Sequence, residues 1–225
     1  DAAADEVILL REHVRQSEEN NIAGGLMRFL AAHGVTRVRV PDAFPLALAR
    51  ELEKKYEVVS GGDHLFPERA RKTEWEIEEI AKASKAVDVS LLAAEEFLRR
   101  CEIRGDRIYH KGELATSVML REIVDRALYR EGYLGIGTIV ASGREAADPH
   151  CAGAGPLIAR MPIVCDIFPL SLRTHYYSDE TRTLFKGEPS DDIKKMYAAV
   201  YEVQAGAIGE IRAGARGREI YEWVK

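Results

Sequence analysis

Hydrophobic and polar residues alternate along the first part of the chain with two different periods. Helical spacing is seen over residues 7–14 and again over residues 22–30. Residues 36–40 and 56–60 alternate with a period of two, which predicts strands, and residues 45–55 between them predict a helix. This order of elements indicates part of a small α/β domain, because two short strands are few for a complete core.

A long amphipathic pattern follows. Thr73, with Glu76 three residues later, predicts a capping box, and the helix that it opens keeps apolar residues on one face as far as Leu98. Another helix is predicted from about residue 112 to residue 130, and Gly132 is suited to its end.

Strand-like segments follow residue 135. They cover residues 136–141, 162–168 and 176–185. Ser190, followed by two aspartates, predicts the start of a further helix, and a last helical pattern runs over residues 217–225. The mixture indicates an α/β (α+β) fold with an antiparallel sheet and covering helices.

Composition excludes several classes of protein. The 225 residues are 46% hydrophobic and 31% charged with a net charge of −5, which is typical of a globular protein without a large basic excess for nucleic acid. No apolar run reaches the roughly 18 residues of a membrane helix. From the charge and the apolar runs we expect no nucleic-acid or membrane partner. Three cysteines without a Cys-x-x-Cys spacing favour a reducing compartment, so we expect a cytoplasmic location.

Asp166 and Asp179 are the strongest candidates for chemistry. A turn centred on Leu172 and Arg173 would join two strands and place Asp166 directly opposite Asp179. Two carboxylates so close repel each other unless cations lie between them, and two divalent ions about 3.5–4 Å apart would fit the span. Oxygen ligands suit Mn²⁺, and Co²⁺ or Zn²⁺ if a histidine joins. The alternative is an ordinary buried Asp166 and an edge residue Asp179.

His150 is the second candidate. It follows the strand predicted over residues 136–141, where a loop histidine could transfer a proton or hold a substrate carbonyl. The alternative is a solvated side chain. His175, at the tip of the predicted hairpin, is a weaker candidate for contact with a substrate.

Four segments in this order resemble the metallopeptidase family M24, which contains prolidase, Xaa-Pro aminopeptidase and methionine aminopeptidase and has the pita-bread fold. They are residues 71–77, residues 139–150 ending in Pro-His, residues 163–166 ending in Asp, and residues 177–183, Tyr-Ser-Asp-Glu-Thr-Arg-Thr. The resemblance implies that residues 1–70 are the C-terminal part of an amino-terminal, creatinase-like domain. It implies that residues 71–225 are the first half of a pita-bread catalytic domain.

The same resemblance implies roles for the candidate residues. Asp166 would bind one metal ion through both oxygens, Asp179 would bridge two ions, and His150 would stabilise the tetrahedral intermediate or relay a proton. The family usually separates the two aspartates by eleven positions, and here the difference is 179 − 166 = 13. Two extra residues preserve the facing of both carboxylates, because the period of a strand is two.

The resemblance covers about half of the family's site, which also uses a later histidine and two glutamates. No histidine follows Asp179, so we expect a partial chain that is inactive alone. The complete enzyme would be a metal-dependent peptidase that cleaves Xaa-Pro bonds by attack of a metal-bound hydroxide. Its substrate would be a dipeptide or peptide with proline at the second position, and it could form a homodimer. The alternative function is a non-catalytic relative that binds peptides or a protein partner.

Overall fold

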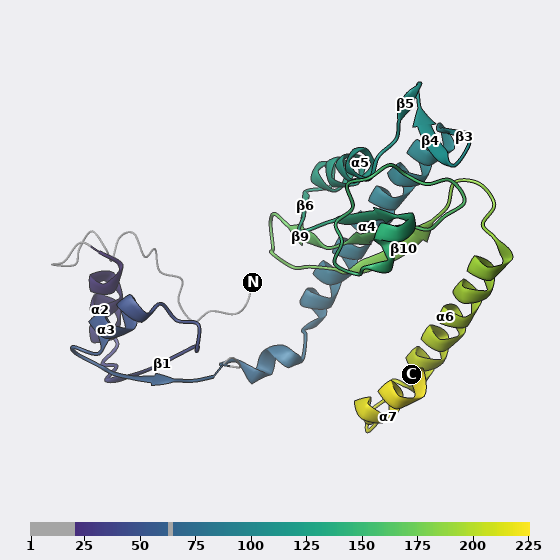
Figure 1. Ribbon diagram of the computed structural model, residues 1–225. Coiled ribbons are helices and arrows are strands. Elements are labelled where there is room, and N and C mark those ends of the chain that lie inside the picture. Colours follow the sequence, from purple (N-terminus) through teal and green to yellow (C-terminus); the bar gives the residue numbers. More distant parts are fainter. Residues whose placement is uncertain (1–20, 63–64) are drawn as a thin grey trace. The chain divides into compact units, whose positions relative to one another are not determined.

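The computed structural model describes residues 21–62 and 65–225, and the helix predicted over residues 7–14 lies outside them. The chain forms two compact units, Asp1–Lys72 and Thr73–Lys225. The described part of the first unit contains α2 (Ile22–Ala32), β1 (Arg37–Val40), α3 (Leu46–Leu52) and β2 (Glu57–Ser60) (Figure 1).

The first unit has a small core of its own. Strands β1 and β2 pair in parallel with α3 as the connection, which is a βαβ crossover. Ala23, Met27 and Leu52 are its buried apolar residues, and the Tyr56 hydroxyl donates a hydrogen bond of 2.8 Å to the Met27 carbonyl. The predicted helices and strands of residues 22–60 are therefore present.

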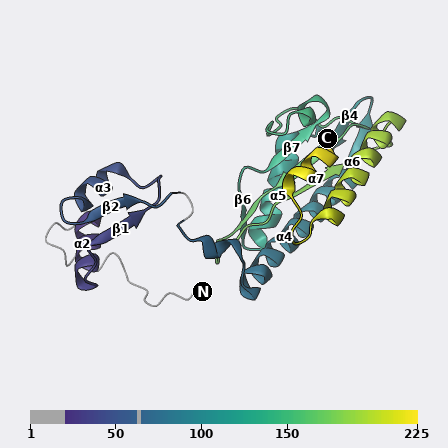
Figure 2. The same cartoon turned by 90° about the horizontal axis from the view of Figure 1, so that it is seen from below.

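Two long helices support the second unit. Helix α4 (Glu74–Arg99) begins at the predicted capping box, in which Thr73 and Glu76 bind each other's backbone groups. Helix α5 (Ser117–Arg130) packs against α4, and both helices contact strands of the unit (Figure 2).

The strands of the second unit form three small antiparallel sheets. The orders are β10-β8-β7, β3-β4-β5 and β6-β9. Their bounds are β3 Glu102–Arg104, β4 Arg107–His110, β5 Glu113–Leu114, β6 Tyr133–Gly135, β7 Ile139–Ser142, β8 Ile163–Ile167, β9 Pro169–Ser171 and β10 Glu180–Leu184. The core between helices and strands includes Val87, Leu120, Val124, Leu128, Val140, Ile163, Cys165 and Ile167, all fully buried.

Two expectations about element bounds are wrong. The helix predicted from residue 112 begins only at Ser117, because Thr116 caps it and residues 113–114 pair with β4 instead. The hairpin of β3 and β4 was not predicted. Strands of three and four residues give too short an alternation to recognise.

Short 3₁₀ helices and two final helices complete the chain. The 3₁₀ helices are η1 (Pro67–Ala70) and η2 (Gly143–Ala147). Ser190 caps α6 (Asp191–Glu210) as predicted, and α7 (Gly217–Val224) packs on α6. Within the described residues, no helix is both long and apolar enough to cross a bilayer.

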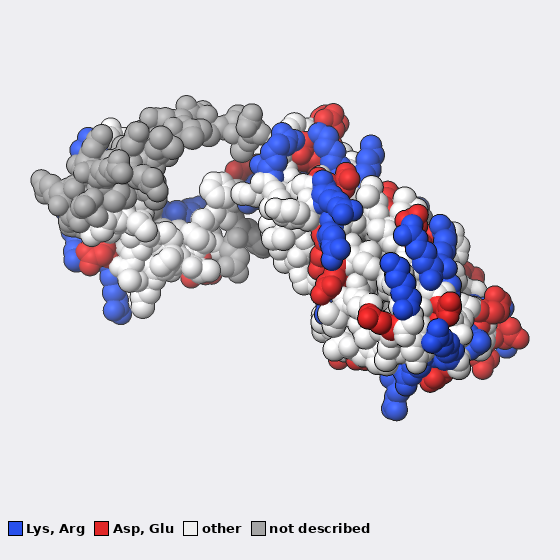
Figure 3. All heavy atoms as spheres, turned by 90° about the horizontal axis from the view of Figure 1, so that it is seen from above, with Lys and Arg blue, Asp and Glu red and all other residues white. Residues whose placement is uncertain are grey.

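Acidic and basic side chains are interspersed on the face that Figure 3 displays. On α4, for example, Arg99 pairs with Glu95 at 2.7 Å and Arg100 with Glu96 at 3.2 Å, each one helical turn apart. Exposed pairs of this kind contribute little to stability but keep the surface solvated.

Candidate functional site

Strand β8 places Asp166 by simple alternation. Ile163, Cys165 and Ile167 are fully buried, whereas Val164 and Asp166 on the opposite face are half-buried. Burial raises the pKa of the Cys165 thiol to about 12, which is the effect expected in a dry core. The carboxylate of Asp166 therefore lies on the face of the sheet that points away from the core.

The predicted register of the hairpin is wrong by one step. Asp166 lies opposite Thr181, not opposite Asp179, and Leu170 lies opposite Tyr177. The turn has four residues centred on Arg173 and Thr174, one residue later than predicted. When the centre of the turn moves by one residue, the residue opposite each strand position changes by two. Side chains that were expected on the same face of the sheet therefore still lie on the same face.

Asp179 consequently lies on the same face as Asp166, at a diagonal position. Such positions are about 7–8 Å apart between Cα atoms, against about 4.5–5.5 Å for directly opposite residues. The Thr181 hydroxyl, directly opposite Asp166, donates a hydrogen bond of 2.7 Å to Oδ1 of Asp166. Of the residues that the structure describes, none makes a hydrogen bond or ion pair with the exposed Asp179 carboxylate.

Glu79 of α4 explains where the turn is centred. Its side chain is buried, and its carboxylate accepts hydrogen bonds from Arg173 at 3.2 Å, from the Thr174 hydroxyl at 3.1 Å and from Lys82 at 2.6 Å. The hydrogen bond from Lys82 lowers the pKa of Glu79, and Thr174 and Arg173 act in the same direction, while burial opposes them. A charged Glu79 therefore holds the turn at its two central residues.

The strand after the turn is also anchored on α4. Tyr176 donates from its hydroxyl to Glu76 at 2.5 Å and packs edge-on against Trp75, with ring centroids 5.5 Å apart. The Ser178 and Ser84 hydroxyls are 2.8 Å apart. The residue directly before Asp179 is thus bonded to the helix beneath it.

His150 lies on an exposed loop that is bonded to β7. Its backbone N–H donates to Asp148 at 2.9 Å. Two residues later, the Ala152 carbonyl accepts from the Val140 N–H at 3.2 Å and from Arg121 at 2.6 Å. Val140 is the neighbour of Ile139, which pairs with Asp166. The loop is thus bonded to the edge of β7, and β7 is the strand that pairs with β8, which carries Asp166.

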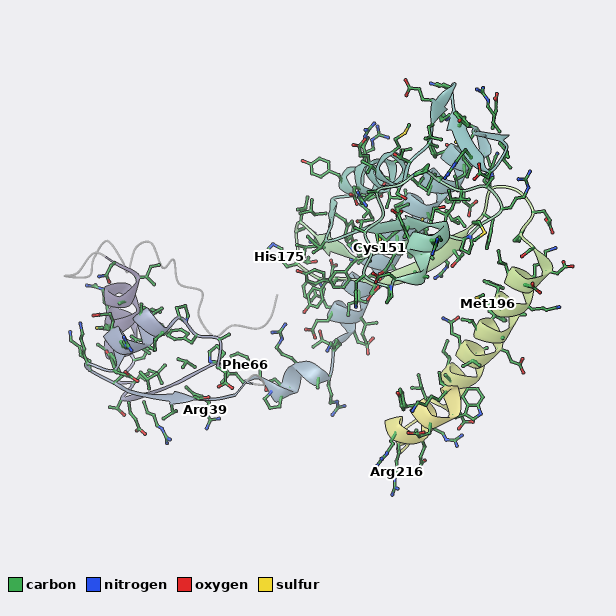
Figure 4. All side chains as sticks on the ribbon, in the orientation of Figure 1. Arg39, Phe66, Cys151, His175, Met196 and Arg216 are labelled. Atoms are coloured by element: carbon green, nitrogen blue, oxygen red, sulfur yellow. The ribbon has the colours of Figure 1, made fainter. Side chains whose placement is uncertain are left out.

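The other polar candidates lie at the margin. Figure 4 shows the side chain of His175 at the outer end of the turn, and its left-handed backbone has a φ of 59°. Cys151, also labelled there, is on the His150 loop. Arg182 pairs with Glu180 at 2.7 Å and does not contact either aspartate.

Asp166 and Asp179 fit a divalent cation in their donor chemistry, since both offer hard oxygens on one open face. Thr181 binds only one oxygen of Asp166, and none of the described residues makes a hydrogen bond with the other. Over residues 21–62 and 65–225, no group of three or more potential metal ligands is assembled.

Sequence reasoning missed two residues of this region. Thr181 would have been found with the correct register, because it then lies opposite Asp166. Glu79 carries no local signal of its contact with the turn. It lies in an ordinary amphipathic helix, and the turn residues that it binds, Arg173 and Thr174, are 94 and 95 residues away.

Comparison with known proteins identifies relatives over most of the chain. The family model described as metallopeptidase family M24 matches residues 78–225. An Xaa-Pro dipeptidase of Pyrococcus horikoshii is 27% identical over 93% of this chain and 58% of its own length. Xaa-Pro aminopeptidase 1 of Streptomyces coelicolor is 30% identical over 82% of this chain and 36% of its own length. The chain spans about half the length, or less, of these curated relatives.

Solved structures agree on the fold. The prolidase from Pyrococcus horikoshii has a TM-score of 0.71 and 27% identity, and the match covers 87% of this chain and 54% of that one. An Xaa-Pro dipeptidase from Bacillus anthracis has a TM-score of 0.76 at 22% identity over 91% of this chain and 55% of that one. The predicted fold class, that of the pita-bread proteins, is confirmed.

Proposed function

Since the chain belongs to metallopeptidase family M24, we propose that it is part of a metal-dependent peptidase that cleaves Xaa-Pro bonds. The relatives named as Xaa-Pro dipeptidase and Xaa-Pro aminopeptidase support this substrate class. The substrate is a dipeptide or longer peptide with proline at the second position.

One observation supports the proposal above the others. Asp166 and Asp179 lie on one open face of the sheet, and Thr181 orients the first of them. An open face is required because a peptide must reach the carboxylates, and a hydrogen bond from a neighbouring side chain fixes the direction of a ligand.

The residues of this chain have separate roles in the proposal. Asp166 and Asp179 hold two divalent ions, and Thr181 keeps the Asp166 carboxylate in place. Such ions lower the pKa of a bound water and polarise a carbonyl. His150, on its loop beside β7, holds or transfers a proton at its imidazole, and its exposure leaves the ring accessible to a substrate. The remaining ligands of the site come from outside these residues.

Hydrolysis of Xaa-Pro peptides tests the function directly. The full-length gene product is incubated with Ala-Pro and with a longer Ala-Pro peptide, with Mn²⁺ and with a chelator. We expect cleavage that requires the ion and is lost in Asp166→Asn. Absence of ion-dependent cleavage of both peptides would refute the proposal.

Titration of the 225-residue chain with Mn²⁺ separates this function from a non-catalytic binding module. We expect weak binding that Asp179→Asn weakens further, because two carboxylates rarely hold such an ion firmly without nitrogen ligands. A chain whose affinity for the ion does not depend on either aspartate would favour the binding module.

Further predictions accompany this function. We propose Mn²⁺ as the ion, with Co²⁺ or Zn²⁺ as alternatives, and a cytoplasmic homodimer as the assembly. We propose that residues 1–70 belong to an amino-terminal domain and residues 71–225 to the catalytic domain. We also propose that the 225 residues alone do not hydrolyse peptides.

A further inference from the structure

Ser178, the residue directly before Asp179, is a polar side chain on the core-facing side of the hairpin. It lies opposite Pro169 in register, and its N–H donates to the Pro169 carbonyl at 3.4 Å. Pro169 is fully buried, and Ser178 is only 8% exposed. Apolar residues usually fill such positions, so a serine there needs a partner for its hydroxyl.

Helix α4 supplies that partner. The Ser84 hydroxyl lies 2.8 Å from the Ser178 hydroxyl, and Ser84 is itself half-buried. In the parts of the chain that the structure describes, no other side chain makes a hydrogen bond with the Ser178 hydroxyl. The two serines are 94 residues apart in the sequence, so this bond joins the helix to the hairpin.

Asp179 depends on its backbone for its position. The Thr181 hydroxyl orients the Asp166 carboxylate at 2.7 Å, whereas no described residue makes a hydrogen bond or ion pair with the Asp179 carboxylate. Side chains alternate along an extended segment, so a bond that holds Ser178 towards α4 turns Asp179 to the open face. The anchor at Tyr176 lies two residues farther away along the chain.

We propose that Ser84 is a positioning residue for the metal site. Its bond to Ser178 fixes the strand against α4, and so holds the Asp179 carboxylate at the distance from Asp166 at which both bind the divalent ions. The inference rests on the proposed function, in which the two aspartates hold these ions, and it adds a residue that acts only through Ser178. Removal of a hydrogen bond that orients a metal ligand typically weakens metal binding by about 10–100-fold.

Calorimetric titration of the full-length protein with Mn²⁺ tests this role. In Ser84→Ala we expect Mn²⁺ to bind about tenfold more weakly, because no directional bond then holds the strand. The same substitution should change the affinity less than about twofold in an Asp179→Asn background, where the positioned ligand is already lost. In an Asp166→Asn background it should keep its full effect, because Asp179 is still present.

Matched variants distinguish positioning from a general effect on the fold. Ser90 is a fully buried serine of α4 whose hydroxyl donates within the helix, to the Val87 carbonyl at 2.8 Å. Ser90→Ala should therefore lower the free energy of unfolding without changing the affinity for Mn²⁺. Ser84→Thr keeps the hydroxyl and should keep the affinity. The double variant Ser84→Ala, Ser178→Ala leaves no unpaired hydroxyl and should also bind Mn²⁺ about tenfold more weakly, even if Ser84→Ala alone does not fold.

The outcomes separate this proposal from the function on which it rests. If the wild type binds Mn²⁺ and the double variant binds it equally tightly, Ser84 has no positioning role and the peptidase function stands. A loss in Ser84→Ala that is equally large in the Asp179→Asn background, or that Ser90→Ala shares, would also overturn the proposal. If the wild type binds no Mn²⁺, the metallopeptidase function fails, and the positioning role fails with it.

Discussion

Gly153 controls how closely the His150 loop can approach β7. Its backbone has a φ of +76°, and a Cβ at this position would overlap the carbonyl oxygen of Val140. The Cβ would also lie 2.8 Å from the Val140 carbonyl carbon and 3.0 Å from the Cα of Ala141. These neighbours are backbone atoms of a buried strand, so the loop must move away in Gly153→Ala.

The expected loss of stability has two parts. A non-glycine residue in the left-handed region costs about 1–2 kcal/mol. Movement of the loop also breaks the bond between the Val140 N–H and Ala152 and displaces Arg121, whose guanidinium donates to Ala152 at 2.6 Å and to Gly153 at 3.0 Å. These bonds contribute about 1 kcal/mol each. The sum is about 4–5 kcal/mol, which lowers Tm by roughly 8–20 °C in a protein of this size.

Gly137→Ala is the matched control. Gly137 has a φ of +68°, and no atom lies within 4 Å of a Cβ added there. Gly137→Ala therefore introduces the same backbone strain as Gly153→Ala but no overlap with neighbouring atoms. Urea denaturation should give a loss of about 1–2 kcal/mol for Gly137→Ala and clearly more for Gly153→Ala. Hydrogen exchange at the Val140 amide should accelerate only in Gly153→Ala. Equal losses in both variants, with Val140 still protected, would refute the reasoning.

Three further results are expected. Thr181→Val should weaken Mn²⁺ binding by about tenfold, measured by calorimetry, because Asp166 loses its hydrogen-bond donor; an unchanged affinity would show that Thr181 has no such role. The lowered pKa of Glu79 stabilises the fold above the pKa of an unfolded glutamate, and this contribution is lost as the pH falls through the folded pKa. The stability of wild type should therefore fall more steeply with decreasing pH than that of Glu79→Gln, which is less stable near neutral pH and depends less on pH in that range; parallel curves would contradict this. Cys165, fully buried with a pKa of about 12, should react with a thiol reagent only on unfolding, whereas the half-buried Cys151 should react in the native state. The test uses a variant in which Cys101 and Cys151 are replaced by serine. Rapid labelling of Cys165 in this variant under native conditions would show that the core is open.

Local signals in the sequence predicted the elements that have them. The capping box at Thr73, the cap at Ser190 and the apolar run over residues 162–168 are each readable within a few residues, and the two caps and a strand over residues 163–167 are present. The β3–β4 hairpin was missed because its strands of three and four residues are too short to establish a period. Helix α5 was predicted too long because β5, which precedes it and pairs with β4, has only two residues and so gives no period that could be recognised.

The candidate site was predicted in composition but not in register. The alternation of side chains in β8 suffices to place Asp166 on the open face. Asp179 lies on the same face even with the wrong turn centre, because the error in register is two residues and the period of a strand is also two. The correct centre depends on Glu79, whose contacts with Arg173 and Thr174 span nearly half of the chain. No rule based on neighbouring residues can supply such a contact, because the energies that decide the turn come from tertiary structure.

The bond between Glu79 and the turn also has a consequence for synthesis of the chain. Arg173 and Thr174 are translated 94 and 95 residues after Glu79, so at about 5–20 residues per second the acid waits several seconds for its partners. Until then nothing holds the turn at its centre, and the two aspartates have no defined spacing. The proposed cation site therefore cannot assemble before β10 has been translated, and slow translation between α4 and β10 would prolong the interval in which Glu79 is open to solvent.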